Sequence, residues 1–446
     1  MRVPLQSIAL PTLVLLTAVA LAGCQAEPPF NVLLISYDTL RADHLGLYGY
    51  DRDTSPNLDL LGEQAVVFES AIAQASSTYP SHMSLFQSRH ASRITPDSPM
   101  LAELLQDAGY STAAFTGGGN VAGTFGFDKG FKLYEEARPP SSLADSLPRF
   151  EAWLKSQQLQ GQPAEPFFVF LHTFGIHHPY DPPAPFNSMF FDEYDGPITG
   201  KSTANLLNKL RRIHSFSKSE DEVDLPAYHR KKVEALYDGG IRHADSYLAR
   251  IQNLLIELDL WDKTIVVFLS DHGEEFWEHN AVLHSFTVFQ EVIHVPLVMK
   301  LPNQRPGGLR IDQQVRLMDV APTLLDLLDI PIPETMLGRS LLPMIDGEGA
   351  NLIAVSEMGP YKALVDPPNK LIVDTTSGRL SLFDLSLDPG EQHDIFEQNP
   401  AAAKQLHRYL VGSLQSLKTD QVDGIAKVLP KDKELVEQLR SLGYLD

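Results

Sequence analysis

The sequence predicts an α/β fold, in which a parallel sheet is packed between helices, followed by a smaller C-terminal unit. Residues 31–36 and 264–269 are short apolar runs rich in branched side chains, as strands buried on both faces of a parallel sheet are. Residues 241–258 carry leucine and isoleucine at helical spacing and predict a helix that packs on such a sheet. Beyond residue 347 the pattern changes to short strands with tight turns, which predicts a small antiparallel sheet.

The rest of the chain follows the same patterns. Residues 181–224 are rich in Pro, Asn and Ser, and we interpret them as a lid or insertion without readable secondary structure. The length suits one large core at 30–347 and a smaller subdomain at 348–446. Strands are also expected at 111–115, 167–171, 295–299, 354–358, 370–373 and 380–385, and helices at 57–68, 100–108, 320–328, 401–417 and 435–442.

The N-terminal segment is predicted to be an export signal. A positive start at Arg2, an apolar run over 8–21 and small residues before Cys24 are typical of such signals, and the run is too short to span a membrane. Leu-Ala-Gly-Cys also resembles the bacterial lipoprotein cleavage box, so we expect a signal peptide at 1–23, lipidation of Cys24 and a linker at 24–29. The protein would then be a lipoprotein of the cell envelope, periplasm-facing or in the outer membrane, held at the membrane by acyl chains. The alternative is an ordinary signal peptide with an incidental cysteine, and as the only cysteine Cys24 can form no intrachain disulfide.

The formal net charge of −21 limits the partners of the protein. Such an acidic chain is not expected to bind nucleic acid or anionic lipid, because it would repel their phosphates. An anionic substrate would need a local positive centre, which a bound cation would supply. The sequence carries no sign of a particular oligomeric state.

Polar side chains follow three of the predicted core strands. Asp38 and His177 come after two of these strands, and Asp271 and His272 come after a third. Because ligands bind at the carboxyl ends of strands in open α/β sheets, we expect these side chains to meet at one edge. Thr78 lies in a hydroxyl-rich turn that opens a helix, where the helix dipole stabilises an oxyanion.

Two carboxylates, one imidazole and one hydroxyl make a four-ligand divalent site of Asp38, Thr78, Asp271 and His272. The oxygen-rich set suits Mn²⁺, Mg²⁺ or Ca²⁺, and the imidazole leaves Zn²⁺ as an alternative. A metal on Thr78 would lower the pKa of its hydroxyl and make it a nucleophile, while polarising the oxygen of a bound ester. The plainer interpretations are exposed polar residues at strand ends, a Thr78 that only caps its helix, and a structural His177.

Several motifs, in order along the chain, resemble those of the sulfatase family within the alkaline phosphatase superfamily. They are N-V-L-L-I-S-Y-D-T-L-R-A-D from Asn31, T-Y-P-S-H-M-S-L-F from Thr78, H-H-P-Y from His177, S-D-H-G-E-E-F-W-E-H from Ser270, V-R-L-M-D-V-A-P-T-L-L-D from Val315 and L-F-D-L-S-L-D-P-G-E from Leu382. The resemblance implies a mixed, mostly parallel sheet flanked by helices, with a C-terminal subdomain that contains a four-stranded antiparallel sheet.

The departures from the family pattern bear on the chemistry. Thr78 stands where sulfatases carry the Cys or Ser that becomes formylglycine, and Thr39 replaces the second Asp of the first metal pair. His272 replaces the usual Asn, and residues 116–118 stand where the family has a Lys-containing segment. A Thr nucleophile beside Asp-His resembles the superfamily's phosphoesterases, phosphodiesterases and phosphoglycerol transferases. Thr173 occupies the position of an Asp in two-metal members, so one metal is the better interpretation.

The resemblance also suggests roles for residues around the metal. His177 and His284 are expected to hold the anion of the substrate or to protonate the leaving group. His82 stands where the family signature has an Arg, and we assign it to substrate binding together with Arg41 and Arg89. A structural role is the alternative for both arginines.

Three functions compete at this point. The first is a hydrolase that cleaves phosphomono- or phosphodiesters by attack of Thr78 at one divalent metal, after which water releases the phosphothreonine. The second is a sulfate-ester hydrolase that acts without formylglycine. The third is a catalytically inactive, lipid-anchored binding protein of the same fold, although such a protein would have no need of all four metal ligands.

Overall fold

The structure is a computed structural model, and it describes residues 29–137, 141–158, 165–216, 225–304 and 307–415. The predicted signal peptide, Cys24 and the helix expected at 435–442 lie outside these ranges.

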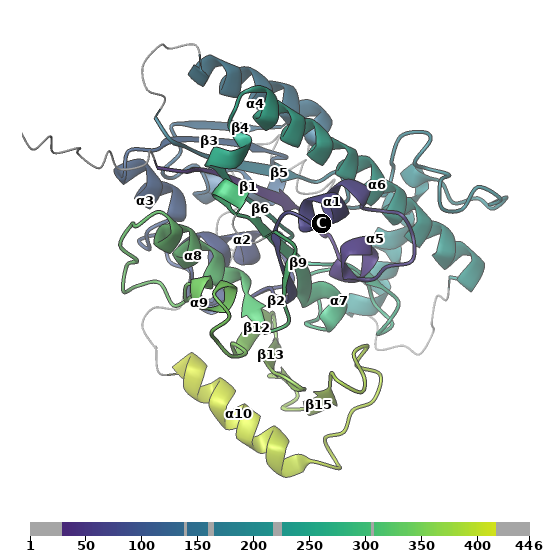
Figure 1. The fold of residues 1–446 in the computed structure, drawn as a ribbon. Helices are drawn as coiled ribbons and strands as arrows, with labels where there is room; N and C mark the ends of the chain where they lie inside the picture. Colours follow the sequence, from purple (N-terminus) through teal and green to yellow (C-terminus); the bar gives the residue numbers. More distant parts are fainter. Residues whose placement is uncertain (1–28, 138–140, 159–164, 217–224, 305–306, 416–446) are drawn as a thin grey trace, which may run out of the picture.

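Two sheets form the framework of the chain (Figure 1). Over the described residues, the nine strands of the main sheet are β1 (Asn31–Tyr37), β2 (Val66–Ile72), β3 (Ser111–Thr116), β4 (Leu133–Glu136), β5 (Phe167–Thr173), β6 (Thr264–Leu269), β9 (His294–Lys300), β10 (Leu309–Ile311) and β11 (Val315–Arg316). The smaller sheet consists of β12 (Ala354–Met358), β13 (Tyr361–Asp366), β14 (Asn369–Asp374) and β15 (Leu380–Asp384), and a separate hairpin pairs β7 (Glu275–Phe276) with β8 (Val282–Leu283).

The main sheet is parallel except for one strand. Its order is β10-β2-β9-β6-β1-β5-β3-β4, with β11 also paired to β2. Strand β9 is antiparallel to both β2 and β6, and the other pairings are parallel. The smaller sheet is antiparallel throughout. The predicted α/β fold with a mostly parallel main sheet and a small antiparallel sheet is therefore confirmed.

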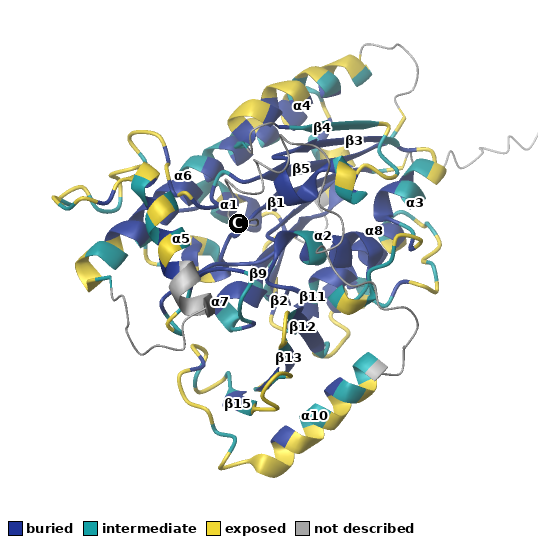
Figure 2. Cartoon of the chain, turned by 180° about the vertical axis from the view of Figure 1, so that it is seen from behind, coloured by how far each residue is buried: buried dark blue, intermediate teal, exposed yellow. Residues whose placement is uncertain are grey.

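Helices cover both faces of the main sheet. They are α1 (Pro56–Gly62), α2 (Thr78–Gln87), α3 (Leu101–Asp107), α4 (Leu143–Gln158), α5 (Gly200–Phe216), α6 (Ala227–Glu257), α7 (Gln290–Ile293), α8 (Val320–Leu327), α9 (Leu342–Ile345) and α10 (Pro400–Gln415). Alternate residues of β1 point to opposite faces: Leu33 and Ile35 pack in the core with α1, α4, α5 and α6, and Val32 and Leu34 pack in the core with α2, α3, α8 and α9. The strands are accordingly buried between two helical layers (Figure 2).

The smaller sheet lies between the main domain and α10. One of its faces, including Ala363 and Phe383, packs against Val292 and Ile293 of the main domain. Its other face packs against buried residues of α10 such as Leu410. The outer side of α10 is exposed (Figure 2). Within the described ranges, no helix is long and apolar enough to cross a membrane.

Two segments differ from the sequence-based expectations. The predicted helix at 57–68 is wrong in its second half, because α1 ends at Gly62 and β2 begins at Val66. Branched and aromatic side chains at 66–68 favour the strand, and pairing with β9 and β10 completes it. The insertion at 181–224 contains a helix, α5, in its described part.

Candidate functional site

The site lies where three neighbouring parallel strands end. Strand β1 pairs with β6 on one side and β5 on the other, so that Ser36 is aligned with Leu269 and with His172. Asp38 follows β1 directly, and Asp271 follows β6 after Ser270, so the two aspartates emerge from neighbouring strand ends. This is the position at which open α/β sheets bind ligands.

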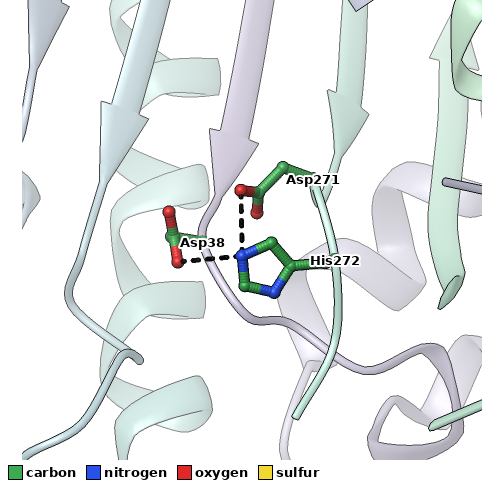
Figure 3. A group of neighbouring side chains, drawn as sticks. All are labelled: Asp38, Asp271 and His272. Carbon is green, nitrogen blue, oxygen red and sulfur yellow. Dashed lines mark ion pairs between the residues drawn. The ribbon is translucent and has the colours of Figure 1, made fainter. Parts of the chain in front are cut away.

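The four residues predicted as metal ligands are close together. Candidate ligand atoms of Asp38, Asp271 and His272 all lie within 4.8 Å of one another, and the three residues are buried (Figure 3). His272 Nε2 is 3.4 Å from Asp271 Oδ2 and 4.0 Å from Asp38 Oδ1. Thr78 is the first residue of α2, and its Oγ1 is 3.3 Å from His272 Nε2.

The two carboxylates lack partners for their charge. Asp38 Oδ1 and Asp271 Oδ2 accept no hydrogen bond from any described residue. Burial raises the pKa of Asp38 to about 6, and burial followed by the charge of Asp38 raises the pKa of Asp271. Two ionised carboxylates at this depth are costly without a compensating cation. The orphaned oxygens, the imidazole and the hydroxyl therefore fit a divalent cation.

Hydrogen bonds orient these candidate ligands. His272 Nδ1 donates to the Gly273 carbonyl at 2.9 Å, which directs the lone pair of Nε2 toward the carboxylates. The Ser81 hydroxyl donates to the Asp271 carbonyl at 2.6 Å, which ties α2 to the loop after β6. The start of α2, which carries Thr78, is thereby fixed relative to Asp271 and His272.

Two further imidazoles lie behind the carboxylates. His82 Nδ1 donates to the Thr78 carbonyl at 3.0 Å, and the Ser36 hydroxyl donates to His82 Nε2 at 2.9 Å. His172 Nε2 donates to Asp38 Oδ2 at 3.3 Å. Burial lowers the pKa of His82 and of His172 to about 4, so both rings are neutral at pH 7 and supply no positive charge.

A second pair of histidines borders the site. The His284 ring centroid is 4.5 Å from that of His272 and 4.9 Å from that of His177. His284 Nδ1 donates to Glu274 Oε1 at 2.8 Å, and the Tyr180 hydroxyl donates to Glu274 Oε2 at 2.8 Å. The buried Glu274 carboxylate thus fixes the orientation of the His284 ring.

The two arginines assigned to substrate binding lie elsewhere. The Arg41 guanidinium is bound to the carboxylates of Asp43 and Glu278 and donates to the Glu274 carbonyl at 3.0 Å. These contacts brace the loop that follows His272. Arg89 follows the far end of α2, a helix of ten residues and hence about 15 Å, so the structure does not bring it to the site.

The sequence reasoning left His172, Glu274 and Tyr180 without a role. His172 lies at the carboxyl end of β5, which is the same signal that identified Asp38. Glu274 and Tyr180 both belong to motifs that were recognised, but only the fold shows that they meet.

The fold and the site define an α/β protein with a group of Asp and His residues that could hold a divalent metal. The family model described as Sulfatase matches residues 30–330. Arylsulfatase K of Mus musculus is 27% identical over 374 residues, which cover 71% of this chain and 65% of the mouse protein, slightly less than two thirds of its length.

Two solved structures share the fold. Phosphonate monoester hydrolase of Agrobacterium radiobacter has a TM-score of 0.68 at 21% identity, over 87% of this chain and 96% of that chain. Phosphonate monoester hydrolase SpPMH from Silicibacter pomeroyi has a TM-score of 0.70 at 21% identity, over 91% and 98%. The chain belongs to the sulfatase family. Enzymes of this family generally bind a divalent metal.

We expect Gly273→Ala to disturb the site without touching a candidate ligand. A Cβ at this position would lie 2.0 Å from the Glu291 carbonyl oxygen and 3.2 Å from Arg41 Cγ, so the backbone after His272 must move. The free energy of unfolding should fall by about 1–3 kcal/mol, and metal affinity should weaken. Urea denaturation and metal titration measure both, with Gly412→Ala as the control, because a Cβ there meets nothing within 4 Å. Equal effects in the two variants would contradict this prediction.

We expect the contribution of Asp38 to the stability of the metal-free protein to fall as the pH rises, whereas the contributions of the buried, neutral His82 and His172 increase. The pKa of Asp38 is raised from 3.8 to about 6, so its protonated form stabilises the fold fully below about pH 4, and this contribution is lost as the pH rises through about 6. At about 1.4 kcal/mol per pKa unit the loss is on the order of 3 kcal/mol. Urea denaturation of the chelator-treated natural protein and Asp38→Asn between pH 5 and about 7.5 isolates the upper part of this loss, about 1.4 kcal/mol, as the change in the difference between the two proteins. Stability should rise more steeply with pH in Asp38→Asn, and identical pH profiles of the two proteins would refute the assignment.

Proposed function

We propose that this protein hydrolyses phosphomonoesters or phosphodiesters through a Thr78 nucleophile at a single divalent metal. The observation that carries the proposal is the convergence of the Thr78 hydroxyl with His272 and two orphaned carboxylate oxygens at the start of α2. Ser77, not Thr78, is the N-cap of α2, so the alternative that Thr78 only caps its helix is wrong.

Asp38, Thr78, Asp271 and His272 are the proposed ligands of the metal. Mn²⁺, Ca²⁺ or Mg²⁺ suits their oxygen-rich set, with Zn²⁺ as an alternative. When bound, such an ion lowers the pKa of a coordinated hydroxyl and polarises an ester oxygen. The ion also provides the positive charge that an anionic substrate needs in a chain of net charge −21.

Thr78 carries the covalent step in this proposal. Its Oγ loses its proton and attacks phosphorus, the bond from phosphorus to the leaving oxygen breaks, and that oxygen gains a proton, so that a phosphothreonine and an alcohol form. Water then attacks the same phosphorus, which returns the Thr78 hydroxyl and releases phosphate or its monoester. Thr78 is the first residue of α2, and the positive end of the helix dipole there stabilises negative charge on Oγ during both steps.

His177 and His284 are the proposed anion-binding and proton-transfer groups. Because Nδ1 of His284 donates to Glu274, we assign proton transfer to the leaving group to Nε2 of that ring. Burial lowers the pKa of His177 well below its usual value, so His177 acts as a neutral ring that binds the substrate.

The remaining candidates position other groups in this proposal. His82 contacts both Thr78 and Asp271 and orients the nucleophile. Arg41 holds the backbone of the loop through the Glu274 carbonyl. Arg89 has no part in the reaction because of its distance.

A sulfate-ester hydrolase is the second candidate function. Arylsulfatase relatives favour it, since their names imply sulfate esters. Because position 78 is neither Cys nor Ser, such an enzyme would have to cleave sulfate esters with the Thr78 hydroxyl and without formylglycine. An inactive, lipid-anchored binding protein is the third.

We expect Thr78→Ala to abolish turnover, by about 10³-fold or more in kcat, because the nucleophilic oxygen is lost. The variant should retain its metal through the other three ligands, as measured by plasma mass spectrometry. Thr78→Ser, which keeps an oxygen, should retain part of the activity. Full turnover by Thr78→Ala would overturn the nucleophile assignment and leave only an indirect role.

We expect the metal-loaded protein to cleave aryl phosphates, phosphodiesters or phosphonates faster than aryl sulfates. The measurement is initial rate on a matched set of 4-nitrophenyl esters. Turnover of the sulfate alone would favour the second candidate, and no turnover of any ester, with metal bound, would favour the binding protein.

We expect Cys24 to carry a lipid that anchors the protein at the cell envelope. Full-length protein expressed in a bacterial host with labelled palmitate should incorporate the label and fractionate with membranes. Cys24→Ser should lose the label and leave the membrane fraction. Labelling that survives this substitution would exclude Cys24 as the acceptor.

A further inference from the structure

The carboxylate of Glu275 is buried outside the proposed catalytic site and lacks a hydrogen-bond donor at ordinary geometry. Glu275 begins β7, and its side chain is 0% exposed. Neither of its oxygens accepts a hydrogen bond of ordinary length and angle from a described residue, although the nearby Thr287 hydroxyl favours its ionised form. Buried carboxylates are normally paired with a positive charge or bound to a metal, so we expect Glu275 to have a partner of one of these kinds.

Glu291 and His279 lie next to this carboxylate. Ligand atoms of the three residues all lie within 4.8 Å of one another. His279 Nδ1 is 2.6 Å from Glu291 Oε1, and its Nε2 donates to the Glu391 carbonyl at 3.1 Å. The imidazole also stacks on Phe289, with ring centroids 3.5 Å apart. An imidazole whose one nitrogen is bound to a carbonyl while the other faces carboxylates is the arrangement that metal-binding histidines adopt.

The net charge of the buried groups around Glu275 matches one divalent cation. Lys370 Nζ lies 2.7 Å from Glu391 Oε1, and these two buried groups neutralise each other. Glu275 and Glu291 then remain, with two negative charges between them. A cation of charge +2 bound beside a neutral His279 makes the cluster electrically neutral.

We propose that Glu275, His279 and Glu291 form a second divalent-cation site, separate from the one at Thr78. Two carboxylates and one imidazole suit Zn²⁺ or Mn²⁺ better than Ca²⁺. A cavity of about 440 Å³, lined by His279, Thr287 and Glu391 among others, gives the ion a route to the site.

The role of this second site is structural. It binds the loop that follows Asp271 and His272 to Glu291, which precedes β9. Through His279 and the Glu391 carbonyl it also joins that loop to the C-terminal subdomain. The rival arrangement is a protonated His279 facing Glu291, beside a neutral Glu275.

Metal stoichiometry of the full chain tests this proposal. Protein stripped of metal is dialysed against Zn²⁺, desalted, and its zinc content is measured by plasma mass spectrometry. We expect two ions per chain for the natural protein, one for Asp271→Asn, one for Glu275→Gln and none for the double variant. Glu348→Gln, an exposed acidic control, should retain two. Failure of the Thr78 site alone would instead give equal zinc content in Asp271→Asn and the natural protein.

A second measurement keeps Glu275, His279 and Glu291 unchanged, and it tests the proposal even if Glu275→Gln does not fold. Zn²⁺ added to metal-free Asp271→Asn should raise its thermal unfolding temperature, because the ion binds only the folded state. No rise, no zinc retained by Asp271→Asn, or two ions retained by Glu275→Gln would each overturn the proposal in favour of the protonated arrangement.

Discussion

The close approach of two buried carboxylates is the constraint on which the rest of the structure depends. Asp38 and Asp271 are 0% and 1% exposed, and each keeps one oxygen without a hydrogen-bond donor. Neighbouring imidazoles that could share this charge are held neutral by burial. In a medium of low polarity, like charges at such a distance repel strongly. The folded state therefore accommodates them best with a cation between them, and the catalytic proposal follows from that requirement.

Backbone hydrogen bonds of the main sheet bring Asp38 and Asp271 together in spite of the repulsion between them. Strands β1 and β6 are fully buried and pair in parallel over six positions, so the residues that follow them have little freedom to separate. The loop after β6 is then held from several sides. Ser81 of α2, the Glu291 backbone against Gly273 and the guanidinium of Arg41 each contact it. The packing of apolar side chains on both faces of the main sheet thus offsets the repulsion between Asp38 and Asp271 at its edge.

The hydrophobic periodicity of the sequence predicted some elements correctly and others wrongly. Residues 264–269 were predicted as a strand with the bounds that β6 has, because a wholly apolar, branched run between turns has few other interpretations. The segment 57–68 was misassigned, because Val66 begins a strand whose pairing partners are distant in sequence. Arg89 was assigned to the substrate as a positively charged group, whereas the helix between it and Thr78 separates the two residues.

The sequence by itself determined the fold class and the types of residue at the site, since buried strands that end in Asp38 and Asp271-His272 are visible as a pattern. Only the tertiary structure decided that His172 contacts Asp38, that Glu274 joins Tyr180 to His284, and that Glu275 is buried without a donor. Periodicity reports which face of an element is apolar. It does not report which polar groups from distant segments share one desolvated space, because that depends on strand order and loop closure.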